Sequence, residues 1–221
     1  MPLSDVVRAI RERDPAARTS IEIYLTYPGL HAIGLHRAAH WLHQRRRRLL
    51  ARIVSNLNRT LTGIEIHPGA QLGLGVFIDH GMGVVIGETA IVGDNVTLYQ
   101  GVTLGGTGKE RGKRHPTIEA GVTVGVGAAI LGAVTVGTGA KIGAGAVVLR
   151  DVPAHTSAVG VPARAVVATD PASGMSRRLE SLPDPDRDSM LALLQRIEEL
   201  EEKVTALNAE RRLPNEVGTM R

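Results

Sequence analysis

The chain contains no cysteine. It therefore cannot form disulfides or thiolate metal sites. Aromatic residues are also scarce, with one tryptophan, three tyrosines and one phenylalanine in 221 residues. A protein that binds single-stranded nucleic acid needs aromatic side chains on which bases stack, together with several basic patches. We therefore expect no nucleic-acid partner.

Long apolar runs are missing too. None reaches the ~18 residues that a membrane span requires, and the N-terminus does not resemble a signal peptide. The formal net charge of +4 comes from arginine, and Arg45–Arg48 is the one dense basic run. Because this run lies in a segment with a helical pattern, it indicates a solvated helix face or a subunit contact. We expect a soluble, cytoplasmic protein with no membrane partner.

A six-residue period runs through the middle of the chain. Each period has one aliphatic residue, and in most periods a small or β-branched residue lies two positions earlier. The aliphatic positions are Leu72, Ile78, Ile86, Val92, Leu98, Leu104, Ile118, Val124, Ile130, Val136, Ile142 and Val148. Neither a helix nor a simple alternating strand has this period. A fixed short period is typical of a solenoid, whose units are too small to bury an apolar face alone.

The pattern predicts a mainly β fold, a parallel β-helix built from hexapeptide repeats. Three repeats close one triangular coil, with the aliphatic residue inside the prism and the small residue packed into a corner. Glycine and asparagine at the turns supply backbone angles with positive φ. We expect this β-helix to occupy residues 63–166 and to be the catalytic domain.

Helical patterns flank the repeats. Residues 1–62 are predicted to form a helical N-terminal domain, with Ser4 and Thr19 as candidate caps and Gly63 at its end. Residues 167–188 are rich in proline, aspartate and serine, which favours a linker.

Residues 189–212 carry a separate signal. Apolar residues alternate spacings of three and four, as at the a and d positions of a coiled coil. They are Met190, Leu193, Ile197, Leu200, Val204 and Leu207. About three heptads are marginal alone but sufficient if a trimeric β-helix holds the strands together. We expect a parallel three-stranded coiled coil, with a helix packed on the solenoid as the alternative, followed by a flexible tail over 213–221.

The repeat breaks its register twice. The spacing is eight between Ile78 and Ile86, and fourteen between Leu104 and Ile118. The extra residues fall in 79–83 and in the polar, charged segment 105–116. Such insertions leave the prism as loops, and loops often carry function. Each insertion contains a histidine, which favours a functional role over a tolerated insertion.

His80 in the first break is the best candidate for a general base. Imidazole suits the removal of a proton from a weakly acidic group near neutral pH. It needs an acceptor to orient it, and Glu65 lies fourteen residues before the Asp79-His80 pair, close to one coil away. We therefore expect Glu65 and His80 to be vertical neighbours. Such a pair would fix the tautomer and stabilise the imidazolium ion.

Over residues 14–164 the chain resembles the serine O-acetyltransferases, which acetylate L-serine with acetyl-CoA for cysteine biosynthesis. The resemblance is carried by GIEIHPGA at 63–70, IDHGMGVVIGET at 78–89, GVTLGGTG at 101–108 and KRHP at 113–116. These strings are far more specific than the repeat itself. The resemblance implies a left-handed β-helix.

The resemblance also implies roles for individual residues. His80 matches the family's general base, and Glu65 matches its acidic partner, which is aspartate in many members. Asp14 and Asp79 match positions that hold the substrate ammonium, whereas Arg114 and His115 match positions that face the substrate carboxylate. An amino acid carries both charges, and a planar guanidinium suits a carboxylate.

For acetyl-CoA, the resemblance implies a groove between neighbouring subunits of a homotrimer, with no metal. The pantetheine would contact the backbone of Gly106, Val126 and Ala144, and Lys141 is a candidate phosphate contact. Direct transfer needs no nucleophile on the protein, which agrees with the absence of cysteine. Cysteine is the expected feedback inhibitor, since it resembles serine.

Two departures from the family pattern carry expectations. The N-terminal helical region is shorter than in members that join two trimers into a hexamer, so we expect no trimer-to-trimer contact. The chain ends in Arg221 rather than in the terminal isoleucine that many members insert into O-acetylserine sulfhydrylase. We therefore expect a weak or absent complex with that enzyme.

Three alternatives remain at this stage. Another hexapeptide O-acetyltransferase, with a sugar or homoserine acceptor, would share the fold and the histidine. A metal enzyme of the γ-carbonic anhydrase type would need three histidine ligands, but no paired histidine spacing of that kind is present. A non-catalytic trimeric scaffold would have no need of Asp79-His80 and Arg114-His115.

Overall fold

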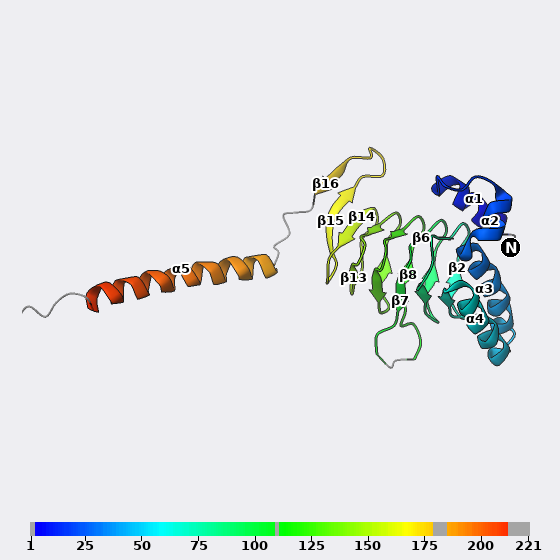
Figure 1. Ribbon diagram of the computed structural model, residues 1–221, viewed down its shortest axis with the longest axis horizontal. Helices are drawn as coiled ribbons and strands as arrows, with labels where there is room; N and C mark the ends of the chain where they lie inside the picture. The colour runs from blue at the N-terminus through cyan, green and yellow to red at the C-terminus, as the bar shows by residue number, and fades with distance from the viewer. Residues whose placement is uncertain (1–2, 109–110, 179–184, 212–221) are drawn as a thin grey trace, which may run out of the picture. The chain divides into compact units, whose positions relative to one another are not determined.

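The computed structural model describes residues 3–108, 111–178 and 185–211 (Figure 1). Its contacts divide it into two units, Met1–Leu179 and Glu180–Arg221. The helices are α1 (Ser4–Arg13), α2 (Ser20–Thr26), α3 (Pro28–Gln44), α4 (Arg48–Thr62) and, in the second unit, α5 (Pro185–Arg211). In the described part of the chain, no helix is long and apolar enough to cross a membrane.

Short parallel strands stack into three sheets, and the chain visits the sheets in turn. The first sheet contains β1 (Glu65–Ile66), β4 (Val85–Ile86), β7 (Thr103–Gly105), β10 (Ala129–Leu131) and β13 (Val147–Val148). The second contains β2 (Gln71–Leu72), β5 (Ile91–Val92), β8 (Thr117–Ile118) and β11 (Thr135–Val136). The third contains β3 (Phe77–Ile78), β6 (Thr97–Leu98), β9 (Thr123–Val124), β12 (Lys141–Ile142), β14 (Thr156–Val159), β15 (Arg164–Thr169) and β16 (Ser176–Arg178). This is the predicted triangular β-helix.

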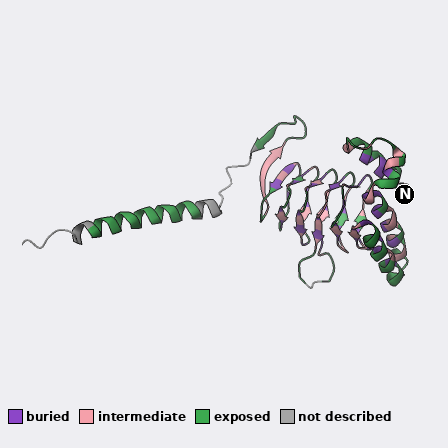
Figure 2. Cartoon of the chain, viewed as in Figure 1, coloured by how far each residue is buried: buried purple, intermediate pink, exposed green. Residues whose placement is uncertain are grey.

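The core contains a column of buried aliphatic residues inside the prism and continues into the N-terminal helices. Figure 2 colours the buried residues along the chain. Predicted core residues such as Ile86, Leu104 and Ile130 are fully buried, and Leu72 is partly buried at the first coil. Residues in register stack directly, for example Ile86 on Leu104 and Leu104 on Ile130. Burial of each such side chain contributes roughly 1.5–3 kcal/mol relative to leaving it exposed.

Two corners of the prism matter for function. The His80 edge is the corner where the chain passes from the third sheet to the first. The His115 edge is the corner where it passes from the first sheet to the second. The loop 106–116 replaces a single turn on the His115 edge, since it joins β7 directly to β8. The spacing of fourteen between Leu104 and Ile118 therefore covers one turn of the coil.

The N-terminal helices pack against the first coils. Arg13 at the end of α1 donates to Thr97 Oγ1 at 3.1 Å and to Asn95 Oδ1 at 3.0 Å. The start of α3 presses against β3, since a Cβ on Gly29 would collide with the carbonyl oxygen of Ile78. These contacts bring the end of α1 and the start of α3 to the residues that follow β3.

The structure corrects several local predictions. Ser4 is the first helical residue and not a cap, whereas Thr19 does cap α2, accepting from the N–H of Glu22 at 3.2 Å. The helical pattern after Pro28 is broken by the basic run, where Arg46 has a φ of +60° and separates α3 from α4.

The predicted linker is wrong over residues 167–178. Strand β15 extends the third sheet by antiparallel pairing with β14, and β16 pairs antiparallel with β15. The remainder of the predicted linker up to 184, and the predicted tail over 213–221, lie outside the described residues. In α5 the a and d side chains from Met190 to Leu207 are exposed.

Candidate active site

The loop after β3 presents His80 on the His80 edge. His80 adopts a φ of +57°, and the next turn residues, Gly81 and Gly83, also have positive φ. A non-glycine residue in this region is uncommon and often marks a functional site. Gly81 is required here, because a Cβ on it would collide with Ile64. On this backbone the side chain of His80 is 74% exposed.

Two carboxylates lie beside this loop. Asp79 Oδ1 is 4.0 Å from His80 Nε2. Burial raises the pKa of Asp79; His80 opposes the rise, and the charge of Asp14 adds to it. Asp14, at the end of α1, accepts from the Tyr27 hydroxyl at 2.6 Å. Burial and this hydrogen bond raise the pKa of Tyr27 to about 12, so the phenol stays protonated.

Glu65 does not occupy the predicted register. The residue one coil above Glu65 is Val85, so Glu65 and His80 are not vertical neighbours. The extra residues of the His80 loop lengthen the first coil, so a spacing of fourteen residues is shorter than one full coil. The carboxylate of Glu65 pairs instead with Arg59 Nη1 of α4 at 3.1 Å. A partnership between Glu65 and His80 stays a prediction.

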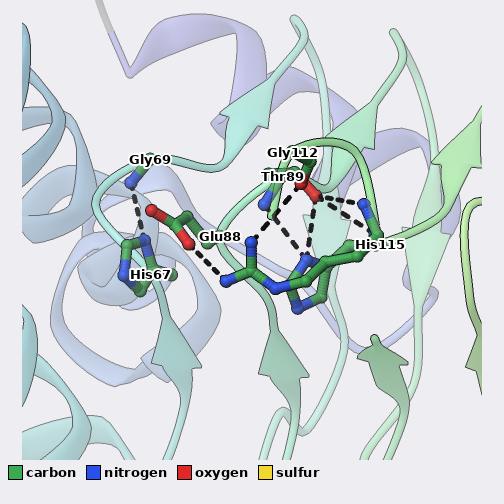
Figure 3. A network of polar contacts seen from close by, with 7 residues as sticks. His67, Gly69, Glu88, Thr89, Gly112 and His115 are labelled. Carbon is green, nitrogen blue, oxygen red and sulfur yellow. Dashed lines mark hydrogen bonds and ion pairs between the residues drawn. The ribbon is translucent and has the colours of Figure 1, made fainter. Parts of the chain in front are cut away.

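The His115 edge carries a network of polar contacts around Glu88, Thr89 and His115 (Figure 3). Arg114 Nη2 pairs with the carboxylate of Glu88 in the turn after β4. The hydrogen bond from Arg114 is the main cause that lowers the pKa of Glu88. Because a guanidinium has five N–H donors, groups remain for a second carboxylate.

His115 is held in the same cluster. It is 9% exposed, and its ring contacts the hydroxyl and backbone N–H of Thr89. Burial lowers the pKa of His115; Arg114 and Lys113 reinforce the decrease, and Glu88 opposes it. His115 therefore stays neutral to a lower pH than a free histidine.

The residues expected to meet acetyl-CoA divide between the two edges. Val126 and Ala144 lie in exposed turns stacked on the His80 edge, where Gly145 donates to the Val126 carbonyl at 2.8 Å. Gly106 lies on the His115 edge, and a Cβ there would come 3.3 Å from His115 Nε2. Lys141 is exposed on β12. One protomer thus places His80, Val126 and Ala144 on one corner and Gly106 on another.

Sequence reasoning missed three residues that organise these clusters, namely Tyr27, Glu88 and Thr89. Glu88 and Thr89 lie on the same edge as Arg114 and His115, one coil earlier. That relation was hidden because the insertion at 105–116 disguises the length of the coil. Tyr27 carried no signal beyond its position before Pro28. Among the described residues, no group of histidine and acidic side chains could hold a metal ion.

The fold and the two polar edges define a hexapeptide-repeat acyltransferase. No family profile matches the chain. It is 54% identical over 205 residues to the serine acetyltransferase of Synechococcus elongatus, covering 91% of this chain and 82% of that relative. It is 52% identical over 206 residues to the enzyme of Bacillus pumilus, covering 93% and 95% of the two chains.

Solved structures agree. The serine acetyltransferase of Vibrio cholerae superposes with a TM-score of 0.73 at 48% identity, over 74% of this chain and 64% of that one. The soybean enzyme complexed with serine has a TM-score of 0.72 at 49% identity, over 74% of this chain and 68% of that one. The Brucella abortus enzyme in complex with coenzyme A has a TM-score of 0.73 at 47% identity, over 74% of this chain and 66% of that one.

The chain belongs to the serine acetyltransferase family. It is therefore an acyltransferase enzyme with acetyl-CoA as co-substrate. The fold carries the left-handed winding of that family's hexapeptide-repeat β-helix.

Proposed function

We propose that this chain transfers the acetyl group of acetyl-CoA to the hydroxyl of L-serine by direct attack, with His80 as general base. The observation that carries the proposal is the pairing of an exposed imidazole with two carboxylates on one edge, while a guanidinium and a neutral imidazole share another. Together these groups complement an amino acid that has a hydroxyl to be deprotonated.

Asp14 and Asp79 would bind the substrate ammonium. The charge of Asp14 helps to raise the pKa of Asp79, which means that the two carboxylates repel each other. A cation between them relieves that repulsion, since opposite charge favours the ionised form of a carboxylate. Arg114 and His115 would bind the substrate carboxylate, with Glu88 orienting the guanidinium.

His80 would take the hydroxyl proton as the serine oxygen attacks the thioester carbonyl. The tetrahedral intermediate then collapses, and the C–S bond to coenzyme A breaks as the carbonyl re-forms. The thiolate receives the proton from the imidazolium. Backbone N–H groups near the glycine-rich segment 105–108 are proposed to stabilise the oxyanion, and Glu65 is proposed as the acidic partner of His80.

A complete site then requires two copies of the chain. The carboxylates with His80 and the cluster of Arg114 with His115 lie on different corners of one prism. In a ring of identical subunits, the His80 edge of one protomer faces the His115 edge of the next. We propose such a homotrimer, with acetyl-CoA in the groove between subunits, contacted by Gly106, Val126 and Ala144, and by Lys141 at its phosphates.

The C-terminal helix supports the same assembly. The exposed a and d residues of α5 include Leu193, Ile197 and Leu200, and apolar side chains at this spacing are buried in coiled coils. We propose a parallel three-stranded coiled coil over 189–212 as a third domain, in addition to the helical domain over 1–62 and the catalytic β-helix over 63–166.

Feedback and location follow from the same chemistry. A serine acetyltransferase has been solved in complex with cysteine, with a TM-score of 0.73 to this chain at 45% identity. Cysteine differs from serine only by sulfur for oxygen, so we propose it as an inhibitor at the serine site. We also propose that the reaction takes place in the cytoplasm, where acetyl-CoA and free serine meet.

The test is release of free thiol from acetyl-CoA by the purified protein. L-serine, homoserine, a galactoside and no acceptor are compared, with the His80→Ala variant alongside. We expect release that depends on serine and is lost in the variant. Release with homoserine or the galactoside, but not with serine, would instead support a different hydroxyl acceptor.

A further inference from the structure

Thr89 makes an unusual set of contacts with the residues that are proposed to meet the substrate carboxylate. Its hydroxyl oxygen accepts from the backbone N–H of Arg114 at 3.0 Å and from that of His115 at 3.1 Å (Figure 3). Its carbonyl oxygen accepts from Lys113 Nζ at 2.9 Å. One residue of the turn after β4 therefore holds three consecutive residues of the next coil.

The hydroxyl proton of Thr89 has one remaining partner among these contacts. Both lone pairs of the oxygen are engaged by N–H donors. The third contact of the oxygen is His115 Nδ1, at 2.9 Å. The hydroxyl must therefore donate to Nδ1, which acts as an acceptor.

The backbone of Thr89 leads to the same assignment. Its N–H lies 3.3 Å from His115 Nδ1. A backbone N–H can only donate, so Nδ1 must again present its lone pair. In a neutral imidazole the single proton then resides on Nε2.

Two glycines lie close to the Nε2 atom of His115. A Cβ on Gly87 would collide with Nε2, and a Cβ on Gly106 would come 3.3 Å from it. The ring is thus packed between two glycines, with its Nδ1 side fixed to Thr89. Its free donor is at the start of the segment 106–116, which also carries Arg114.

We propose that Thr89 is a positioning residue that locks His115 in the Nε2–H tautomer, so that neutral His115 donates a hydrogen bond to the carboxylate of the amino-acid substrate. The proposal rests on the proposed function for the identity of that carboxylate. The tautomer itself does not.

The charges around His115 agree with a neutral donor. Arg114 and Lys113 disfavour a further positive charge, Glu88 favours one, and His67 lies within electrostatic range. Burial is the largest effect, and it disfavours the imidazolium ion. Arg114 then supplies the full charge for the carboxylate, and His115 adds a directed hydrogen bond.

The first test measures the tautomer directly, by ¹⁵N NMR of protein labelled at histidine. The spectrum of His115→Gln assigns the signal of His115. We expect wild type and Thr89→Ser to show the Nε2–H tautomer, and Thr89→Val to show a larger share of Nδ1–H. A wild-type signal from the Nδ1–H tautomer would overturn the proposal, whatever the activity.

The second test separates positioning from general damage. For Thr89→Val we expect the KM for serine to rise about tenfold, the typical cost of one hydrogen bond, with the KM for acetyl-CoA unchanged. Thr89→Ser should keep both constants near wild type. If the valine variant fails to fold, the serine variant still decides: a tenfold loss in Thr89→Ser with its hydroxyl intact would contradict the lock. A wild type inactive with serine but locked at Nε2–H would refute the proposed function and leave the tautomer standing.

Discussion

His80 and His115 are the same residue type in opposite surroundings. The side chain of His80 is 74% exposed, on a backbone with positive φ, and its ion-pair distance to Asp79 is 4.0 Å. His115 is 9% exposed and fixed by Thr89 through its backbone and its ring. The first arrangement leaves an imidazole that a substrate hydroxyl can reach, which a base requires. The second suppresses protonation and suits a fixed donor.

The largest effect should follow from removing His80, the exposed histidine. His80→Ala should lower kcat by at least ~10²-fold, within the range for loss of a general base. The KM for serine should change little, because the carboxylates and Arg114 remain. Steady-state CoA release measures both constants, with thermal unfolding as the control for folding. A variant that keeps a tenth or more of wild-type kcat would exclude His80 as the base.

The next largest effect concerns Arg114, the charged neighbour of the buried His115. Arg114→Lys keeps the charge but loses the planar fork, so the KM for serine should rise about tenfold, in line with loss of one charge-assisted hydrogen bond. The matched variant Glu88→Gln, which keeps Arg114 but weakens its anchor, should give a smaller rise. An unchanged KM for serine with a raised KM for acetyl-CoA would assign Arg114 to the nucleotide instead.

The carboxylates of Asp14 and Asp79 predict that serine binding depends on pH. The folded protein raises the pKa of Asp79 through burial, with a contribution from Asp14. Only the carboxylate form attracts an ammonium, so serine binding should weaken as the pH falls through that raised pKa. Asp79→Asn should raise the KM for serine about fivefold near neutral pH, which corresponds to a loss of roughly 1 kcal/mol of binding free energy. The variant should also lose the part of the acid limb, the rise of KM at low pH, that comes from protonation of Asp79. An acid limb identical in both proteins would contradict this account.

A third histidine sharpens the comparison without touching activity. His36 of α3 is buried, and burial lowers its pKa to about 3, with the charge of His40 adding to the decrease. Because this pKa lies below that of the unfolded chain, His36 favours folding above pH ~6.5, and the benefit declines as the pH falls toward 3. The free energy of unfolding should fall by up to ~1.4 kcal/mol per pH unit in that range. Urea unfolding between pH 7 and 5 should show a smaller slope for His36→Phe; equal slopes would refute the assignment.

The repeat region was the most predictable part of the molecule. A period of six leaves one aliphatic residue per side of the prism, so Ile86, Leu104 and Ile130 could be placed in the core from spacing alone. The insertions were recognisable as loops, but their geometry was not. Each changes the length of one coil, which put Glu65 opposite Val85 and hid the approach of Thr89 to His115.

The remaining errors have a similar physical origin. Strands β15 and β16 form in a segment whose composition favoured a linker, because the exposed edge of β14 offers backbone groups for pairing. The basic run was assigned to a helix, yet Arg46 turns the chain there. Pairing with the preceding strand decides the first case, and a turn in which the N–H of Arg46 donates to the His43 carbonyl decides the second. Local composition does not show either.

The most direct test of the central claim, a site divided between two protomers, is activity in mixed trimers. His80→Ala and Arg114→Ala chains with different affinity tags are co-expressed, and trimers that contain both are isolated. In every mixed trimer of the proposed assembly, one of three interfaces would join an intact His80 edge to an intact His115 edge, so about one third of wild-type activity should return. Each variant alone should be nearly inactive. Mixed trimers as inactive as the separate variants would show that His80 and Arg114 serve the same substrate from one protomer.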